Sequence, residues 1–130
     1  MQSIRALIVV AIVVAGCASW KNINAPTDDP KEMFILVETQ RYAKILNKKI
    51  TAEVTDEVLM VISSDGKEKV PAAGWYNGGH IKYWRKVVHE YDDRVLSGLA
   101  AHEVCHSQSY AHGALFQACI TLLNGYTNSA

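Results

Sequence analysis

The chain has 130 residues, with 13 basic and 13 acidic side chains, 49% hydrophobic residues and 3 cysteines. This length suits a single domain, and the apolar content is too high for a disordered chain. The balanced charge provides no basic field for a nucleic acid, so we expect no nucleic-acid partner.

The first segment has the pattern of a bacterial lipoprotein signal. Arg5 precedes the apolar run 6–15, which is about half the ~20 residues of a membrane span and fits the core of a signal peptide. The run ends at Val14-Ala15-Gly16-Cys17, which resembles a lipobox, in which the cysteine thiol carries a diacylglycerol. We therefore expect residues 1–16 to be a lipoprotein signal peptide and Cys17 to anchor the protein to a membrane of the bacterial cell envelope, on the periplasmic face in a Gram-negative cell. The alternative is an ordinary cleaved signal or a short N-terminal anchor.

The polar residues 17–28 predict a tether, and residues 29–130 a single domain. Because thiols of exported proteins can be oxidised, Cys105 and Cys119 either form a disulfide or are two small buried residues. The sequence leaves both alternatives open.

A first helix is expected from Pro30 to about Asn47, because Asp29 can cap it and Glu32 can close a capping box. Its apolar residues predict the inward face to consist of Met33, Phe34, Val37, Tyr42, Ile45 and Leu46.

Four strands and two further helices are expected after it. The strand runs are 50–54 and 58–62, followed by a turn at 63–66, and then 70–76 and 80–88, joined across 77–79. A helix capped by Asp92 or Asp93 is expected to reach about Ser107. The last helix is expected to run from Gly113 to Leu123, to stop at Asn124-Gly125, and to point Leu115, Phe116, Cys119, Leu122 and Leu123 inward. The predicted fold class is α+β, with a small antiparallel meander sheet.

The residues His102-Glu103-Val104-Cys105-His106 form an H-E-x-x-H motif inside a predicted helix. Positions i and i+4 lie on one helix face, so both imidazoles can hold the same Zn²⁺ at ~2.0–2.1 Å. Glu103 lies beside them, where its carboxylate can reach a metal-bound water. The pattern predicts a hydrolase site with Glu103 as the catalytic base.

The residues after the motif predict the third ligand. No Asp or Glu occurs in the 27 residues after Glu103, so we do not expect a downstream carboxylate ligand. His112 is the one histidine after His106, and residues 107–111 are enough to end the helix and turn the chain back. We therefore expect His102, His106 and His112 to bind Zn²⁺ and to leave one position open, as catalytic zinc sites do.

Plainer interpretations stand beside this one. His102 and His106 would then be polar residues on a solvated helix face, and His112 an ordinary residue at a helix start. The other candidate residues are expected to be solvated surface residues, helix caps or packing residues. They are His80, His89, Glu90, Asp92, Asp93, Tyr83 and Tyr110.

Several segments together resemble the SprT-like and YgjP-like zincin metallopeptidases. They are the hairpin 73–81, the helix lead-in 95–99, the H-E-x-C-H core, and His112-Gly113-Ala114-Leu115-Phe116 as an H-G-x-x-F element. In that family the three histidines bind zinc and the glutamate activates water, so the resemblance implies these roles for His102, His106, His112 and Glu103. The spacing also matches metzincins, but Ser109 stands where they have glycine, and no methionine follows His112. Most members of that family are cytosolic or nuclear, so the export signal expected here differs from the usual location of the family.

These features predict a zinc metallopeptidase that hydrolyses a peptide or protein substrate in the cell envelope. The strand 80–88 is the expected sheet edge on which an extended peptide pairs. The alternative is a non-catalytic, metal-binding lipoprotein that acts as an envelope adaptor. An amidase acting on cell-wall peptide links would use similar chemistry, and the sequence leaves the substrate and the oligomeric state open.

Overall fold

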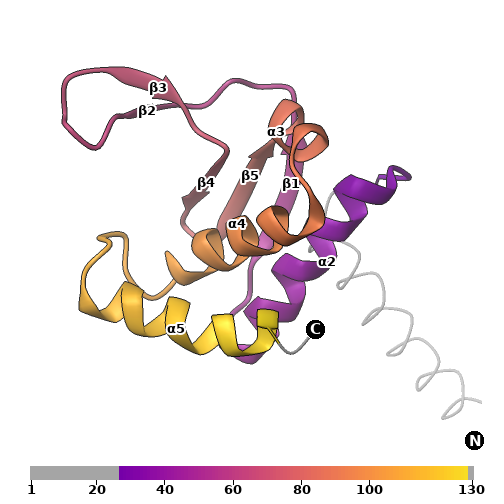
Figure 1. Cartoon of the computed structure of the whole chain (residues 1–130), viewed down its shortest axis with the longest axis vertical. Helices are drawn as coiled ribbons and strands as arrows, with labels where there is room; N and C mark the ends of the chain where they lie inside the picture. Colours follow the sequence, from indigo (N-terminus) through magenta and orange to yellow (C-terminus); the bar gives the residue numbers. More distant parts are fainter. Residues whose placement is uncertain (1–26, 129–130) are drawn as a thin grey trace, which may run out of the picture.

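The computed structural model describes residues 27–128, and these residues form an α+β domain. The predicted signal peptide and Cys17 lie outside the described residues. In Figure 1, α4 crosses in front of the lower part of a sheet, α5 runs below α4, and a hairpin projects at the upper left. The elements in chain order are α2 (Pro30–Ile45), β1 (Thr51–Thr55), β2 (Met60–Ile62), β3 (Lys69–Pro71), β4 (Gly74–Asn77), β5 (His80–Trp84), α3 (Arg85–Glu90), α4 (Asp93–Cys105) and α5 (Ala114–Asn128).

The sheet is mixed, so the expected antiparallel meander is wrong. Its strand order is β1-β5-β4, with β1 parallel and β4 antiparallel to β5. Strands β2 and β3 form a separate antiparallel hairpin around the predicted turn at 63–66. The hairpin across Gly78 and Gly79 is confirmed, and both glycines have positive φ, as a tight turn there requires. Parallel pairing places Ala52 opposite Ile81, so both side chains enter the core.

Three of the expected strands are shortened or interrupted, and the run 58–62 forms a strand only over Met60–Ile62. The run 70–76 is interrupted between β3 and β4, and the run 80–88 ends at Trp84, where α3 begins. The burial pattern gives the reason: Val87 and Val88 are both buried, whereas neighbouring side chains of a strand point to opposite faces. A helical turn brings both valines to the core.

The first helix begins at Pro30 with Asp29 as its cap, as predicted, but its inward face is different. Glu32 does not close the expected capping box, because Asp29 N donates to Thr27 Oγ1 at 3.2 Å. The Asp29 side chain accepts a hydrogen bond from the backbone N–H of Glu32, and Pro30 occupies the first turn. Met33 and Val37, predicted to be inward, are 44% and 52% exposed. The buried face includes polar side chains whose hydrogen bonds are made within the fold, so hydrophobicity alone did not identify it; its residues are Glu32, Ile35, Leu36, Thr39, Tyr42 and Ala43.

The last helix extends further than predicted. It passes through Asn124 and Gly125 to Asn128, since a helix tolerates a single glycine at a cost of only ~1 kcal/mol. Leu115 and Leu122 are exposed rather than inward, while Phe116, Cys119 and Leu123 are buried as expected. Among residues 27–128, no helix has the length and apolar character needed to cross a membrane.

The core lies between the sheet and the helices and contains residues from α2, β5, α4 and α5. Buried hydroxyl pairs tie these elements together: Thr39 Oγ1 lies 2.7 Å from Tyr83 Oη, and Tyr42 Oη lies 2.6 Å from Ser97 Oγ. Ser97 Oγ also donates to Glu38 Oε1 at 2.9 Å. The packing of α2 against α4 therefore includes a polar network as well as apolar contacts.

We expect Glu38→Gln to weaken this network. The hydrogen bond from Arg41 is the main cause that lowers the pKa of Glu38, with a smaller contribution from Ser97. The stability contributed by the carboxylate is therefore present above its ordinary pKa of 4.5 and is lost as the pH falls through the lowered one. At pH 7 the free energy of unfolding of Glu38→Gln should be about 1 kcal/mol lower than that of wild type. This difference should shrink in acid, as measured by urea unfolding, and Glu68→Gln, at an exposed carboxylate of the β2–β3 hairpin, serves as control. A gap that stays constant with pH would contradict the assignment.

Candidate metal centre

Three imidazole rings converge where α4 ends and the chain turns toward α5. His102 lies on α4, His106 caps the C-terminal end of this helix one turn later, and His112 lies in the connection. The ring centroids are 5.0 Å apart for 102 and 106, 5.1 Å for 102 and 112, and 4.9 Å for 106 and 112. The structure therefore brings together the three histidines that the sequence predicts as ligands.

The distances between donor atoms suit a single transition-metal ion. His112 Nε2 lies 3.3 Å from His106 Nε2, and one nitrogen from each of the three rings lies within 4.8 Å of the others. Two nitrogens bound to one tetrahedral Zn²⁺ at ~2.0–2.1 Å lie ~3.3 Å apart. Three neutral imidazoles are also a donor set that suits zinc. The residues present therefore fit this metal.

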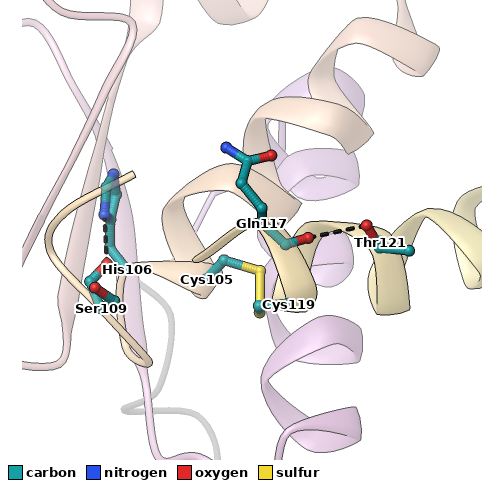
Figure 2. The surroundings of a disulfide bond; sticks show 6 residues. All are labelled: Cys105, His106, Ser109, Gln117, Cys119 and Thr121. Carbon is teal, nitrogen blue, oxygen red and sulfur yellow. Dashed lines mark hydrogen bonds between the residues drawn. A yellow bond between two sulfur atoms is a disulfide. The ribbon is translucent and has the colours of Figure 1, made fainter. Parts of the chain in front are cut away.

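The connection between α4 and α5 places His112 and orients His106. Backbone bonds from Ser107 N to Val104 O and from Gln108 N to Cys105 O turn the chain at the helix end, both at 2.9 Å. His106 Nδ1 donates to Ser109 O at 3.1 Å (Figure 2). The lone pair of its Nε2 is therefore available on the side of the ring where His112 Nε2 lies 3.3 Å away.

A disulfide joins Cys105 and Cys119, with their Cα atoms 5.7 Å apart, and settles the alternative that the sequence left open. Figure 2 shows this bond linking the end of α4, beside His106, to α5. Phe116 lies between the two cysteines in the sequence and is buried. Its ring centroid is 4.9 Å from that of His102 and 4.8 Å from those of His106 and His112. An apolar floor thus lies against all three imidazoles.

Glu103 is buried beside the rings. It is 5% exposed, and its Oε2 lies 4.0 Å from His102 Nε2. Strand β4 covers it closely, because a Cβ on Gly74 would lie 2.9 Å from Glu103 Cγ and 3.2 Å from Oε2. Only glycine gives the carboxylate this room, and sequence reasoning did not single out Gly74 for that purpose.

Burial favours the neutral forms of the groups at the site. It raises the pKa of Glu103 to about 7. Burial is also the largest cause that lowers the pKa of His102 to about 4, followed by repulsion from His106 and His112. Burial lowers the pKa of His106, against the opposing bond to Ser109. At neutral pH the nitrogens of His102 and His106 are therefore free to coordinate a cation.

An open cleft runs past the imidazoles on both sides of Gly74. One depression, of about 320 Å³, lies between the aromatic residues of β4 and the three histidines, with Ile62 of the hairpin and Tyr110 at its margins. The other, of about 440 Å³, has mainly apolar walls; it is lined by Ala73, Gly74, Tyr91, Val95, Gly98, Leu99, His102 and Glu103. A larger depression of about 590 Å³ along α2 shares no residue with the site.

The edge of the sheet differs from the expected one. Strand β5 is central, since it pairs with β1 on one side and β4 on the other. Strand β4 is one of the two edge strands, with β1 on the opposite side, and it contacts α4. The expectation that residues 80–88 offer a free edge is therefore wrong, and β4 takes that place.

Most other candidates have structural roles, as predicted. His80 Nδ1 lies 2.5 Å from Thr51 Oγ1, Asp92 caps α4, and Tyr83 is buried against Thr39. Tyr110 differs, because it reaches the cleft: its Oη accepts a bond from Gly78 N at 3.1 Å, and its ring lies 5.5 Å from that of Tyr76.

A second acidic and histidine cluster joins α2 to α3. His89 Nε2 lies 2.8 Å from Glu32 Oε2, and Asp29 lies nearby. The guanidinium of Arg85 is 3.3 Å from the same Glu32 oxygen, so its charge opposes a cation there. We interpret this cluster as an ion-pair network that fixes the start of α2.

Comparison with known proteins gives no relative: no family model, no curated protein and no solved structure matches the chain.

We expect one equivalent of Zn²⁺ to bind. His112→Ala should weaken the affinity at least tenfold, and His106→Ala should weaken it further, because that ring is the best oriented. Competition with a chromophoric chelator measures both, and His89→Ala in the ion-pair cluster is the control, with unchanged stoichiometry. Wild-type affinity in His112→Ala would exclude that ring as a ligand.

Proposed function

We propose that this chain is a zinc-dependent metallopeptidase of the zincin type, similar to the SprT-like enzymes, and that a lipid on Cys17 tethers it to the bacterial cell envelope. One observation carries the proposal: the imidazoles of His102, His106 and His112 converge beside the buried carboxylate of Glu103 in an open cleft. A chelating histidine set with an adjacent acid is the arrangement that metal-assisted hydrolysis requires.

The protein's own chemistry in this proposal rests on Glu103. When bound, Zn²⁺ acidifies a water molecule and polarises a substrate carbonyl. Glu103 accepts the proton of the attacking water and returns it to the leaving nitrogen. The raised pKa of Glu103 suits both proton transfers near neutral pH. The backbone of Gly74 packs against the Glu103 side chain and holds its carboxylate toward the imidazoles.

The surroundings of the site favour an extended peptide as substrate. The free edge of β4 offers backbone groups with which a peptide can pair, directly beside the imidazoles. The depressions on either side of Gly74 then receive the side chains before and after the scissile bond. Their apolar walls favour apolar side chains at both positions.

The spatial arrangement supports the resemblance that the sequence suggests. The hairpin β4–β5, the H-E-x-C-H helix and the H-G-x-x-F element, although separate in the sequence, all border one cleft. Phe116, the last residue of that element, has a physical role here as the floor under the three rings. The disulfide supports the proposed location, because disulfides persist in the oxidising cell envelope rather than in the cytosol.

A non-catalytic, metal-binding envelope adaptor is the second candidate. The volume of the depression at the imidazoles, about 320 Å³, favours it, since this is at the small end of the ~300–1,000 Å³ typical of ligand sites. Hydrolysis of an unfolded protein that a chelator blocks would separate the two functions.

We expect Glu103→Gln to keep zinc and to lose hydrolysis at least ~100-fold, because the amide cannot accept the proton. Cleavage of unfolded casein, measured alongside the zinc content, tests this. Glu103→Gln protein as active as wild type would remove Glu103 from the mechanism, and the absence of casein cleavage by wild type would favour the adaptor.

Gly74→Ala tests the cover over Glu103. The added methyl would meet Glu103 Cγ at 2.9 Å and must displace the carboxylate. We expect about a tenfold or greater fall in kcat with zinc affinity kept within threefold. Gly125→Ala in α5, where a Cβ meets nothing within 4 Å, is the matched control and should keep full activity. Equal kcat in the two variants would contradict the proposed contact.

A further inference from the structure

The segment that carries His112 has little support of its own. None of residues 107–115 is buried, and Leu115, the second residue of α5, is 71% exposed. The side-chain bonds that hold it locally are exposed or only partly buried: His106 Nδ1 donates to Ser109 O at 3.1 Å, Ser109 Oγ to Ala111 O at 3.0 Å, and Gln117 Nε2 to His112 O at 3.4 Å. Because exposed bonds of this kind contribute little, the segment does not fix His112 by itself.

The buried supports lie at its two ends. Cys105 is fully buried and directly precedes His106, and Cys119 is buried one helical turn beyond Phe116. Their disulfide, shown in Figure 2, therefore closes a loop of the chain, and His106, His112 and Phe116 lie within this loop in the sequence. Without it, no covalent link closes this loop, and the chain between His106 and Phe116 is held by local hydrogen bonds and by Tyr110, whose Oη accepts a bond from Gly78 N at 3.1 Å and whose ring lies 5.5 Å from that of Tyr76.

We propose that the Cys105–Cys119 disulfide is a positioning element that completes the metal centre, so that the site reaches full zinc affinity only in the oxidised chain. The proposal rests on the metal centre described above. Both thiols lose their protons as one S–S bond forms, and the two electrons pass to the disulfide of a thiol oxidoreductase, which becomes a dithiol. The reduced chain keeps His102 and His106 on α4, while His112 is no longer held beside them.

This arrangement would couple assembly of the site to export. A chain still in a reducing compartment holds zinc through the two imidazoles of α4 alone, and acquires the third ligand when it is oxidised in the envelope. The burial of both sulfurs shields the bond from reductants once it has formed. The disulfide is thus a device for assembly, not a reversible switch.

The test is a double-mutant cycle on zinc affinity. We expect Cys105→Ala/Cys119→Ala to bind zinc at least tenfold more weakly than oxidised wild type, which corresponds to about 1.4 kcal/mol. In wild type, His112→Ala should cost at least tenfold, whereas in the cysteine-free protein it should cost less than threefold. Alanine leaves no thiol that could bind zinc in place of an imidazole. The visible spectrum of bound Co²⁺ should change from a tetrahedral to a higher-coordinate form in the cysteine-free protein.

A general loss of stability would give a different result. Val88→Ala, in the buried part of α3, serves as the matched control: it should lower the melting temperature and leave the tenfold effect of His112→Ala intact. If His112→Ala costs as much in the cysteine-free protein as in wild type, the disulfide proposal is overturned and the metal centre stands. If oxidised wild type binds no zinc, the metal centre itself fails.

A second measurement covers the case in which the cysteine-free variant does not fold. Wild type is reduced with a phosphine and its thiols are blocked by methylation, so that they cannot bind zinc. Zinc release is followed together with the loss of the disulfide and the circular dichroism. Zinc should leave in step with the disulfide while helicity is retained. Full zinc retention in the reduced, folded protein would overturn the proposal.

Discussion

The burial of one face of α4 is the constraint on which the site depends. Leu96, Ala100 and Val104 follow one another at helical spacing, and all three are completely buried. This fixes the rotation of the helix, so that His102 and His106 face the cleft and Glu103 faces β4. The same packing brings the sheet edge within van der Waals reach of the carboxylate. The chemistry of the site is thus a consequence of how the helix is seated in the core.

The parts of this arrangement that the sequence predicts are local ones. The start of α2 at Asp29 and the cap of α4 at Asp92 depend on one turn of chain, and both are present. The spacing of His102 and His106 is a property of any helix. The sequence also predicts His112 as the third ligand, because no acidic residue follows Glu103 and the spacing allows the chain to return. The structure does bring His112 to the other two rings.

The parts that the sequence did not predict depend on contacts between distant residues. Parallel pairing of β1 with β5 places Ala52 opposite Ile81, although the β2–β3 hairpin lies between them in the sequence. No local sequence pattern predicts such a pairing. The buried face of α2 was missed because Thr39 and Glu32 find partners on β5 and α3. The role of Gly74 was missed for the same reason, since the side chain that requires it lies 29 positions later in the chain.

The choice of edge strand has a consequence for what the cleft accepts. With β5 in the centre of the sheet, the free backbone groups beside the imidazoles belong to β4, whose four residues offer only a short ladder. A peptide that pairs there must be extended over several residues, and a folded protein rarely presents such a segment. The projecting β2–β3 hairpin places the exposed side chain of Ile62 at the margin of the same cleft, which adds apolar surface for a longer chain. Under the proposed function, a substrate is therefore an unfolded, apolar segment, and selectivity comes from chain conformation more than from a deep pocket for one side chain.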